Sequence, residues 1–361
     1  MKLMNRVVNA GSGTILRHLT SFAASAIAAA MAMPLLAQSY YLTWVNPQPS
    51  ASPAARLCMG MAYDGATHST VLFGGGNGTG TPYLTYGDTW IWRDGLWSQS
   101  FPATSPSPRQ GPGMAYDAAT GTVVLFGGVD TSGTNLNDTW TWDGVTWTQQ
   151  FPAISPPGRQ FDTQGMTYDA ATQTVIFFGG LESNDDVLGD TWTWDGPAKT
   201  WTQQFPTSSP SSRRTTIAYD AVNKTVVLFG GDIRNGDNGL GIYLNDTWTW
   251  DGVDWTQQFP VASPSARGTA SMTYDASLRQ VLLFGGSALY ATEQGLNDTW
   301  TWDGNNWTER NPVARPPARW AAGMDFNATG KSVLLVGGEG NNDVFLNDTW
   351  LLVLRGGTRA V

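Results

Sequence analysis

Six arginines recur at one position of a repeated pattern, each three residues after a proline. They are Arg56, Arg109, Arg159, Arg213, Arg267 and Arg319. A guanidinium group presents a planar fork of N–H donors that fits a carboxylate, so six such groups together could grip a carboxylate or an acidic peptide. The six arginines are therefore the first candidate ligand-binding residues.

Each arginine also has a possible partner inside the chain. An Asp-Thr-Trp triplet follows every arginine, and the triplets begin at Asp88, Asp138, Asp190, Asp246, Asp298 and Asp348. If each aspartate lies at the same end of its repeat as the arginine, six acids match six bases and the pairs are structural. Ligand binding and structural pairing both stay open at this point.

Departures from the repeated pattern give a second set of candidates. The third repeat inserts two residues after Arg159, and the fourth repeat doubles its arginine as Arg213-Arg214. Further candidate ligand-binding residues lie at such departures or in the loops of irregular length. They are Asp162, Glu182, Asp185, Arg214, Arg234, Tyr243, Tyr290, Glu293 and Trp320. A ligand site over the third to fifth repeats is one interpretation, and ordinary solvated loop polarity is the other.

The sequence offers little for metal or redox chemistry. Outside residues 1–37 the only histidine is His68, in a predicted turn, and Cys58 is the only cysteine of the chain. One imidazole cannot build the usual copper or zinc site, and one cysteine cannot form an internal disulfide. We expect no metal site and no cofactor, and no residue is assigned a catalytic role.

The elements that position these residues are six copies of one unit. A Gly-Gly pair ends an apolar run in each copy, and the second glycines are Gly75, Gly128, Gly180, Gly231, Gly286 and Gly338, spaced by 51 to 55 residues. A period near fifty indicates a stacked array of one supersecondary unit. The 42 glycines and 18 tryptophans favour short strands with tight turns over helices.

Each unit divides into four short extended runs, as the second unit illustrates. Residues 109–116 form the first run, 123–126 an apolar second run, 138–142 a third run that alternates Trp with Thr, and 147–150 the fourth. Four antiparallel strands per repeat are typical of one blade of a β-propeller, whose apolar faces are buried only when neighbouring blades stack. We expect the tryptophans to form that layer.

The two ends of the array predict how the ring closes. The sixth unit stops after residue 354 without a fourth strand, whereas residues 40–45 look like a fourth strand with nothing before it. Residues 40–45 should therefore complete the last blade. The predicted blades span residues 56–99, 109–149, 159–203, 213–257, 267–309 and 319–354 plus 40–45, within a propeller of residues 38–355 followed by a tail of residues 356–361.

The pattern resembles the kelch repeat, in which a Gly-Gly follows an apolar strand and two tryptophans follow at fixed distances. The resemblance covers residues 40–354 and implies an all-β, six-bladed propeller, a family defined by shape rather than by activity. In some kelch propellers arginines at this place hold acidic partners. Galactose oxidases have a related propeller, but their copper ligands include two histidines, and outside residues 1–37 this sequence has only His68. Sialic-acid mutarotases are another enzyme family on six kelch blades, and they imply an epimerase as the alternative function.

Strand direction sorts the connections onto two faces. One face carries the turns between first and second strands and between third and fourth strands, which are nearly identical in all units; we call it the turn face. The other carries the six arginines and the loops between second and third strands, which differ in length; we call it the variable-loop face. Divergence among repeats of one chain favours the variable-loop face as the binding surface.

Residues 1–37 differ in composition from the rest. Lys2, Arg6 and Arg17 lead into an uncharged apolar stretch, which indicates a secretory signal peptide, with an uncleaved membrane anchor as the alternative. Removal of residues 1–37 would leave 17 basic and 29 acidic residues, a net charge of −12. That charge disfavours nucleic acid and anionic membranes as partners.

These observations predict a secreted or periplasmic, monomeric propeller. We expect a non-enzymatic protein that binds a protein, peptide or carbohydrate through its variable-loop face, with the mutarotase-type enzyme as the alternative.

Overall fold

The computed structural model describes residues 40–78, 84–182, 186–234, 241–288 and 294–357, with the side chain of Arg234 left out. The predicted signal segment therefore lies outside the described residues. The described residues all belong to one compact unit. No helix in the described ranges is long and apolar enough to cross a membrane.

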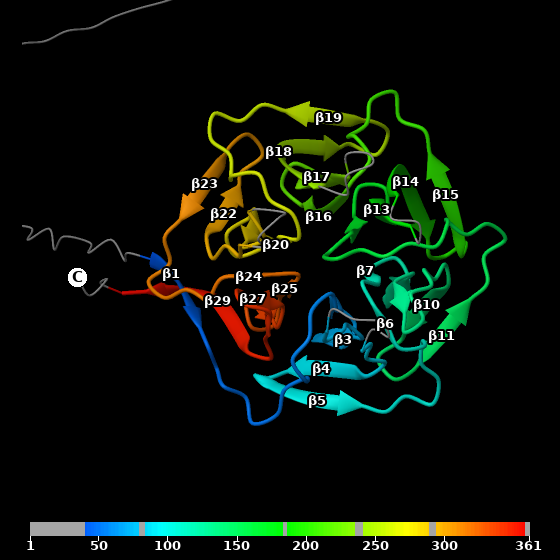
Figure 1. Cartoon of the computed structure of the whole chain (residues 1–361), viewed down its shortest axis with the longest axis horizontal. Helices are drawn as coiled ribbons and strands as arrows, with labels where there is room; N and C mark the ends of the chain where they lie inside the picture. The colour runs from blue at the N-terminus through cyan, green and yellow to red at the C-terminus, as the bar shows by residue number, and fades with distance from the viewer. Residues whose placement is uncertain (1–39, 79–83, 183–185, 235–240, 289–293, 358–361) are drawn as a thin grey trace, which may run out of the picture. The chain divides into compact units, whose positions relative to one another are not determined.

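Six four-stranded antiparallel sheets stand around a central axis, so the predicted six-bladed propeller is confirmed (Figure 1). Blade 1 consists of β2 (Gly60–Asp64), β3 (Ser69–Phe73), β4 (Thr89–Arg93) and β5 (Leu96–Ser100). Blade 2 consists of β7 (Gly113–Asp117), β8 (Thr122–Phe126), β10 (Thr139–Trp142) and β11 (Trp147–Gln150). Blade 3 consists of β12 (Met166–Asp169), β13 (Thr174–Leu181), β14 (Val187–Asp195) and β15 (Thr200–Gln204).

Blade 4 consists of β16 (Arg214–Asp220), β17 (Thr225–Arg234), β18 (Gly241–Trp250) and β19 (Trp255–Gln258). Blade 5 consists of β20 (Ser271–Asp275), β21 (Gln280–Phe284), β22 (Thr299–Trp302) and β23 (Trp307–Arg310). Blade 6 consists of β25 (Gly323–Asn327), β26 (Ser332–Val336), β29 (Thr349–Gly356) and β1 (Tyr40–Val45). Two small sheets lie at the variable-loop face: β6 (Arg109–Gln110) with β9 (Val129–Asp130), and β24 (Arg319–Trp320) with β27 (Glu339–Gly340) and β28 (Val344–Phe345).

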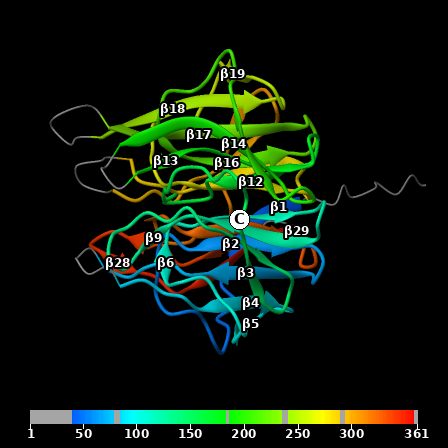
Figure 2. The ribbon, with the colours of Figure 1, turned by 90° about the vertical axis from the view of Figure 1, so that its right-hand side faces the viewer.

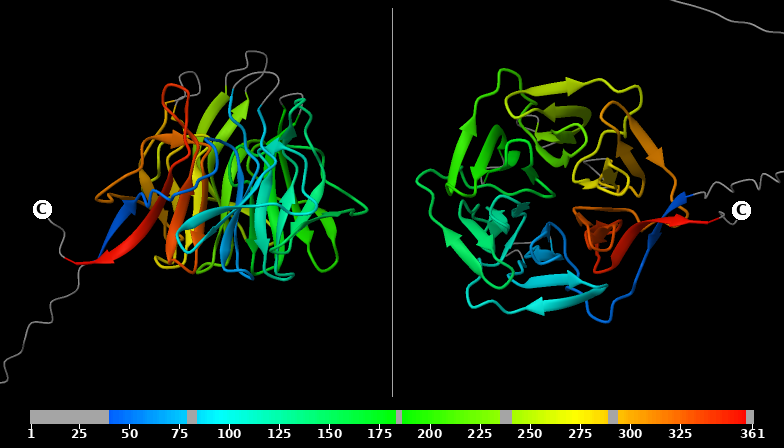
Figure 3. Two further views of the ribbon diagram at one scale, coloured as in Figure 1. Left: turned by 90° about the horizontal axis from the view of Figure 1, so that it is seen from below. Right: turned by 180° about the vertical axis from the view of Figure 1, so that it is seen from behind.

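The first strand of the propeller closes the last blade, as predicted. β1 runs antiparallel to β29 over six residue pairs from Tyr40–Gly356 to Val45–Leu351, which brings Trp44 opposite Leu352. Figure 3 shows β1 in blue beside β29 in red at the rim of the ring. The two ends of the propeller sequence therefore share one blade.

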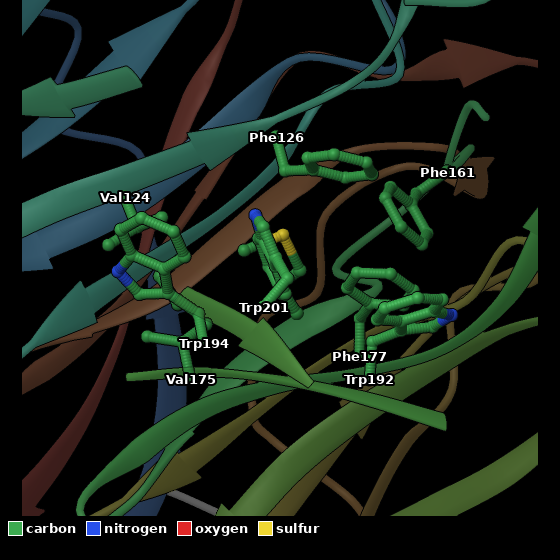
Figure 4. Packing of buried hydrophobic residues seen from close by; sticks show 10 residues of the cluster. Val124, Phe126, Phe161, Val175, Phe177, Trp192, Trp194 and Trp201 are labelled. Atoms are coloured by element: carbon green, nitrogen blue, oxygen red, sulfur yellow. The ribbon is translucent and has the colours of Figure 1, made fainter. Parts of the chain in front are cut away.

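The hydrophobic core consists of layers between neighbouring blades. One layer joins Val124 and Phe126 of blade 2 to Phe177, Trp194 and Trp201 of blade 3 (Figure 4). The Phe126 and Phe177 rings stack with centroids 5.4 Å apart, and both contact the Trp201 ring. Burying an indole of about 200 Å² stabilises the fold by roughly 5 kcal/mol before entropy is counted, so these layers are a main source of stability.

A hydrogen bond crosses every one of these layers. The indole N–H of the tryptophan at one repeated position of each fourth strand donates to the threonine hydroxyl of the preceding blade's Asp-Thr-Trp triplet, at 2.9–3.3 Å. The pairs are Trp44–Thr299, Trp97–Thr349, Trp147–Thr89, Trp201–Thr139, Trp255–Thr191 and Trp307–Thr247. The six bonds run once around the ring, and the pair made by Trp44 depends on β1.

Blades 3 and 4 differ from the others in the length of their middle strands. β13 and β14, and more so β17 and β18, extend past the point where the other blades end, and both hairpins project from the variable-loop face (Figure 2). A register shift separates the blade portion of β17 from its extension at Phe229 and Gly231.

If β1 closes the ring as a full member of blade 6, Trp44 and Trp147 should contribute similar amounts to the free energy of unfolding. Both indoles are at most 1% exposed and bond the preceding blade's threonine. Trp44→Ala and Trp147→Ala should each lower the free energy of unfolding by about 3–5 kcal/mol, because each leaves a large cavity. Urea unfolding followed by tryptophan fluorescence measures both, and a negligible loss for Trp44→Ala alone would contradict closure by β1.

Candidate functional site

The six arginines are bonded within their own blades. In blade 2 the Arg109 guanidinium donates from Nη1 to Asp138 Oδ1 at 2.6 Å and from Nη2 to Asp138 Oδ2 at 2.9 Å. It also donates to the Gly127 carbonyl at 2.9 Å and, from Nε, to the Ser107 carbonyl at 3.0 Å. The guanidinium group is thus held by a carboxylate and two backbone carbonyls.

The same ion pair recurs in every blade. The pairs are Arg56–Asp88, Arg109–Asp138, Arg159–Asp190, Arg213–Asp246, Arg267–Asp298 and Arg319–Asp348, at 2.5–2.7 Å. The arginine side chains are at most 2% exposed, and the aspartates retain 18–23%. A ligand could not reach these guanidinium groups without breaking the pairs. The arrangement agrees with structural pairing and differs from a ring of ligand-gripping arginines.

The Gly-Gly pair is the backbone half of this arrangement. The Gly127 carbonyl accepts from Arg109, and the Gly128 N–H donates to the Arg159 carbonyl of the next blade at 2.8 Å. Both glycines have positive φ, and a Cβ on Gly127 would come within 2.6 Å of that Arg159 carbonyl oxygen. Glycine is required here because the chain turns in a left-handed conformation against its neighbour.

Charge pairing shifts the pKa of the aspartates. Burial alone would raise the pKa of Asp138, but hydrogen bonds and charge from Arg109, with the Trp140 indole N–H, outweigh it and hold the pKa below its usual value. The pKa values of Asp88, Asp190, Asp298 and Asp348 are lowered by the same balance. These carboxylates stay ionised and bound.

Two of the candidates from the irregular third and fourth repeats meet at the variable-loop face. Arg214, at the start of β16, donates from Nη2 to Asp232 Oδ2 at 2.7 Å and also contacts the Asp162 carboxylate through Nη1. Asp162 lies in the two-residue insertion of blade 3, and Asp232 lies in the extension of β17. Arg214 is 16% exposed, more than the six repeated arginines, whereas Asp162 is 17% and Asp232 1% exposed.

The remaining candidates have varied surroundings. Tyr243 pairs with Asp232 across β17 and β18, and its ring packs against Gly268 of blade 5. Trp320 is 7% exposed and packs with Cys58 and Ala321. Glu182 is half-buried just after β13. Asp185, Tyr290 and Glu293 lie outside the described residues, and so does the side chain of Arg234.

A cavity in the central channel was not foreseen from the sequence. It has a volume of about 240 Å³ and lies between the inner strands, where the lining residues include Asp325, Gln164 and Thr273. Asp325 accepts hydrogen bonds from the Tyr63 N–H of blade 1 at 2.6 Å and from the Thr273 hydroxyl of blade 5 at 2.9 Å. One signal could have revealed Asp325, because the equivalent positions of the other repeats carry only Ala or Thr.

Gln164 crosses this channel. The side-chain N–H of Gln164 donates to the Met61 carbonyl of blade 1 at 2.9 Å, and the backbone carbonyl of Gln164 accepts from the Ile217 N–H of blade 4 at 3.0 Å. Phe161 anchors the start of the insertion by packing edge-on against Phe177. The insertion of blade 3 therefore contacts Arg214 on the variable-loop side through Asp162, and it reaches blades 1 and 4 through Gln164.

In the part of the chain that the structure describes, no three His, Cys, Asp or Glu side chains are grouped closely enough to hold a metal ion. Cys58 is buried, and burial raises the pKa of its thiol well above the usual value. A thiol held in its protonated form is a poor nucleophile and a poor metal ligand.

The lowered aspartate pKa values predict acid lability. Carboxyls with a depressed folded pKa stabilise the protein above the unfolded pKa of about 4, and that contribution is lost as the pH falls through the folded pKa. The free energy of unfolding should therefore fall between about pH 4 and pH 2. Asp275 and Asp325, whose pKa burial raises, act in the opposite direction mainly above about pH 4. Urea midpoints measured across this range test it. The double variant Asp138→Asn, Asp190→Asn should show a shallower decline, and an equal slope in parent and variant would contradict the assignment.

Comparisons with known proteins agree with this architecture. The family model described as the KLHDC2/KLHL20/DRC7 Kelch-repeats domain matches residues 60–251 and again residues 166–358. An F-box/kelch-repeat protein of Arabidopsis thaliana is 34% identical over 155 residues, which cover 39% of this chain and 30% of the relative. The tRNA wybutosine-synthesizing protein 4 of Aspergillus fumigatus is 30% identical over 136 residues, which cover 36% of this chain and 12% of the relative.

The chain thus spans less than a third of the length of these two relatives. Among solved structures, that of YjhT superposes with a TM-score of 0.60 at 14% identity and covers 85% of this chain and 99% of that chain. This likeness shows a common fold. Since the two overlapping family matches together span residues 60–358, the chain belongs to the kelch-repeat β-propellers.

Proposed function

We propose that this propeller is a non-enzymatic, extracytoplasmic binding protein that recognises a polypeptide segment with the variable-loop face of blades 3 and 4. The extracytoplasmic part of the proposal is supported by the composition of residues 1–37. The choice of binding over catalysis is supported by the pairing of the six repeated arginines with aspartates.

The observation that carries the proposal is that all six repeated arginines are already paired. A mutarotase-type site needs arginines available to a sugar carboxylate and a nearby acid or base with a shifted pKa. The described cavity is lined by no arginine and no glutamate, and the six repeated arginines are buried against aspartates. This arrangement favours a binding module over an enzyme acting on acidic sugars.

The projecting hairpin of blade 4 supplies the features of a polypeptide-binding surface. Ile242 of β18 is 46% exposed and lies opposite Ile233 of β17, so the two isoleucines share one face of the hairpin. Asp232 and Tyr243 share the other face, where Asp232 binds Arg214. An apolar pair of one exposed and one half-buried isoleucine beside a charged network matches the apolar centre and polar rim of protein interfaces. A carbohydrate would instead favour flat aromatic faces and many hydroxyl-binding groups.

Peptide selection tests this assignment. Peptides selected against residues 38–361 from a displayed random library should bind Ile242→Ser at least about tenfold more weakly than the parent, because the variant removes the exposed apolar contact. Val253→Ser is the matched control: Val253 is 70% exposed in the turn between β18 and β19, at the opposite end of the blade. It should bind within about twofold of the parent. Calorimetry or biolayer interferometry measures the dissociation constants.

Three outcomes would overturn the proposal. The selected peptides could bind parent and Ile242→Ser equally, or lose affinity only for Val253→Ser, which would place binding on the turn face. Acceleration of anomer exchange in a sugar acid, followed by proton NMR, would show an enzyme instead.

A further inference from the structure

The channel cavity is lined by aromatic side chains at one repeated position. The residue before the last one of each inner strand is Tyr63, Tyr116, Tyr168, Tyr219, Tyr274 or Phe326, and all six line the cavity. The rings are half-buried, and Tyr116, Tyr168 and Phe326 also pack against the layers between blades. Since this position adjoins the turns that begin each second strand, the aromatic ring lies toward the turn face, away from the variable-loop face of the proposed function.

Asp325 is the one charged residue among the described residues that line the cavity. It is half-buried, and its carboxylate accepts from the Tyr63 N–H at 2.6 Å, the Phe326 N–H at 2.7 Å and the Thr273 hydroxyl at 2.9 Å. These donors are neutral. Among the described residues, no lysine, arginine or histidine lines the cavity to balance the charge. Desolvation by burial raises the pKa of Asp325, as expected for a carboxylate without a nearby cation.

Gln164 gives the cavity a polar floor. Because it bonds blade 1 and blade 4 from blade 3, it spans the channel between the aromatic ring and the Asp162–Arg214 network. Thr167 and Thr273 add hydroxyl groups to the wall. The volume of about 240 Å³ is smaller than the roughly 300–1,000 Å³ of pockets for drug-sized ligands, so the cavity suits a small molecule.

We propose that this cavity is a binding site for a small organic ammonium ion, with Asp325 as counter-ion and the surrounding tyrosines as its aromatic wall. Aromatic rings attract cations through their negatively charged faces, and quaternary ammonium groups are bound in aromatic cages for this reason. A metal ion fits less well because Mg²⁺ and Ca²⁺ require six or more oxygen ligands, whereas this wall is mostly aromatic and aliphatic. The site is independent of the polypeptide-binding proposal and lies on the other side of Gln164.

Choline and its neutral isostere 3,3-dimethylbutan-1-ol are the probes that separate charge from shape. Each probe is titrated with residues 38–361 and followed by proton NMR. Binding should shift the choline methyl signal upfield, because the methyl groups then lie within the ring currents of the tyrosines. We expect choline to bind at least about tenfold more tightly than the neutral isostere, because only choline pairs with Asp325.

Two variants locate the effect. Asp325→Thr should weaken choline binding at least about tenfold, and the fold should tolerate it because Thr167 and Thr273 occupy the equivalent positions of blades 3 and 5. If the Asp325→Thr variant does not fold, Asp325→Asn takes its place in the test. Glu309→Thr removes the same charge from an exposed site on β23 and should leave choline affinity within about twofold.

The proposal is overturned by any of four results. These are equal affinity for choline and its neutral isostere, no shift of the choline methyl signal up to about 10 mM, choline binding by the folded Asp325 variant as tight as that of the parent, or an equal loss with Glu309→Thr.

Discussion

The propeller depends on one hydrogen bond made six times, from a buried indole N–H to a buried threonine hydroxyl of the preceding blade. A buried indole N–H without a partner is costly, so the threonine hydroxyl of the neighbouring Asp-Thr-Trp triplet favours the burial of each fourth-strand tryptophan. The bond thereby fixes the register of neighbouring blades as well as contact between them. A six-membered circuit of this kind also explains why the two ends of the propeller sequence share blade 6.

The aspartate of the same triplet joins the core to the variable-loop face. Its carboxylate accepts hydrogen bonds from the blade's arginine and from the tryptophan of the same triplet. The indole nitrogen lies 2.6–2.8 Å from the carboxylate oxygen. One short motif therefore supplies the interblade bond through threonine, the arginine anchor through aspartate and the core through tryptophan. Because the architecture uses these repeated residues, we propose that specific function depends on residues that depart from the repeat, such as Arg214, Asp325 and Gln164.

The fold was predictable because its signals are periodic and redundant. Six Gly-Gly pairs, six triplets and an orphan fourth strand at Tyr40–Val45 all indicate one closed ring. The site was predictable only in part, since spacing shows that Arg109 and Asp138 lie at the same end of a blade but not that their side chains meet. The grouping of Asp162 with Arg214 followed from irregularity in the third and fourth repeats. Gln164 was missed because its side chain reaches from blade 3 to Met61 of blade 1, which is not a neighbouring blade. Asp325 was missed because its partner Tyr63 lies in blade 1, which adjoins blade 6 in the ring but is far away in sequence.

The central claim is that the six arginine–aspartate pairs are equivalent parts of the architecture and that none is reserved for a ligand. The most direct test is the free energy of unfolding of six single variants, Arg56→Ala, Arg109→Ala, Arg159→Ala, Arg213→Ala, Arg267→Ala and Arg319→Ala, measured by urea denaturation. Every variant should lose about 3 kcal/mol or more, because each leaves a partly buried carboxylate without its partner. One or two arginines that can be replaced without loss of stability would contradict the claim and mark those positions as part of a binding site.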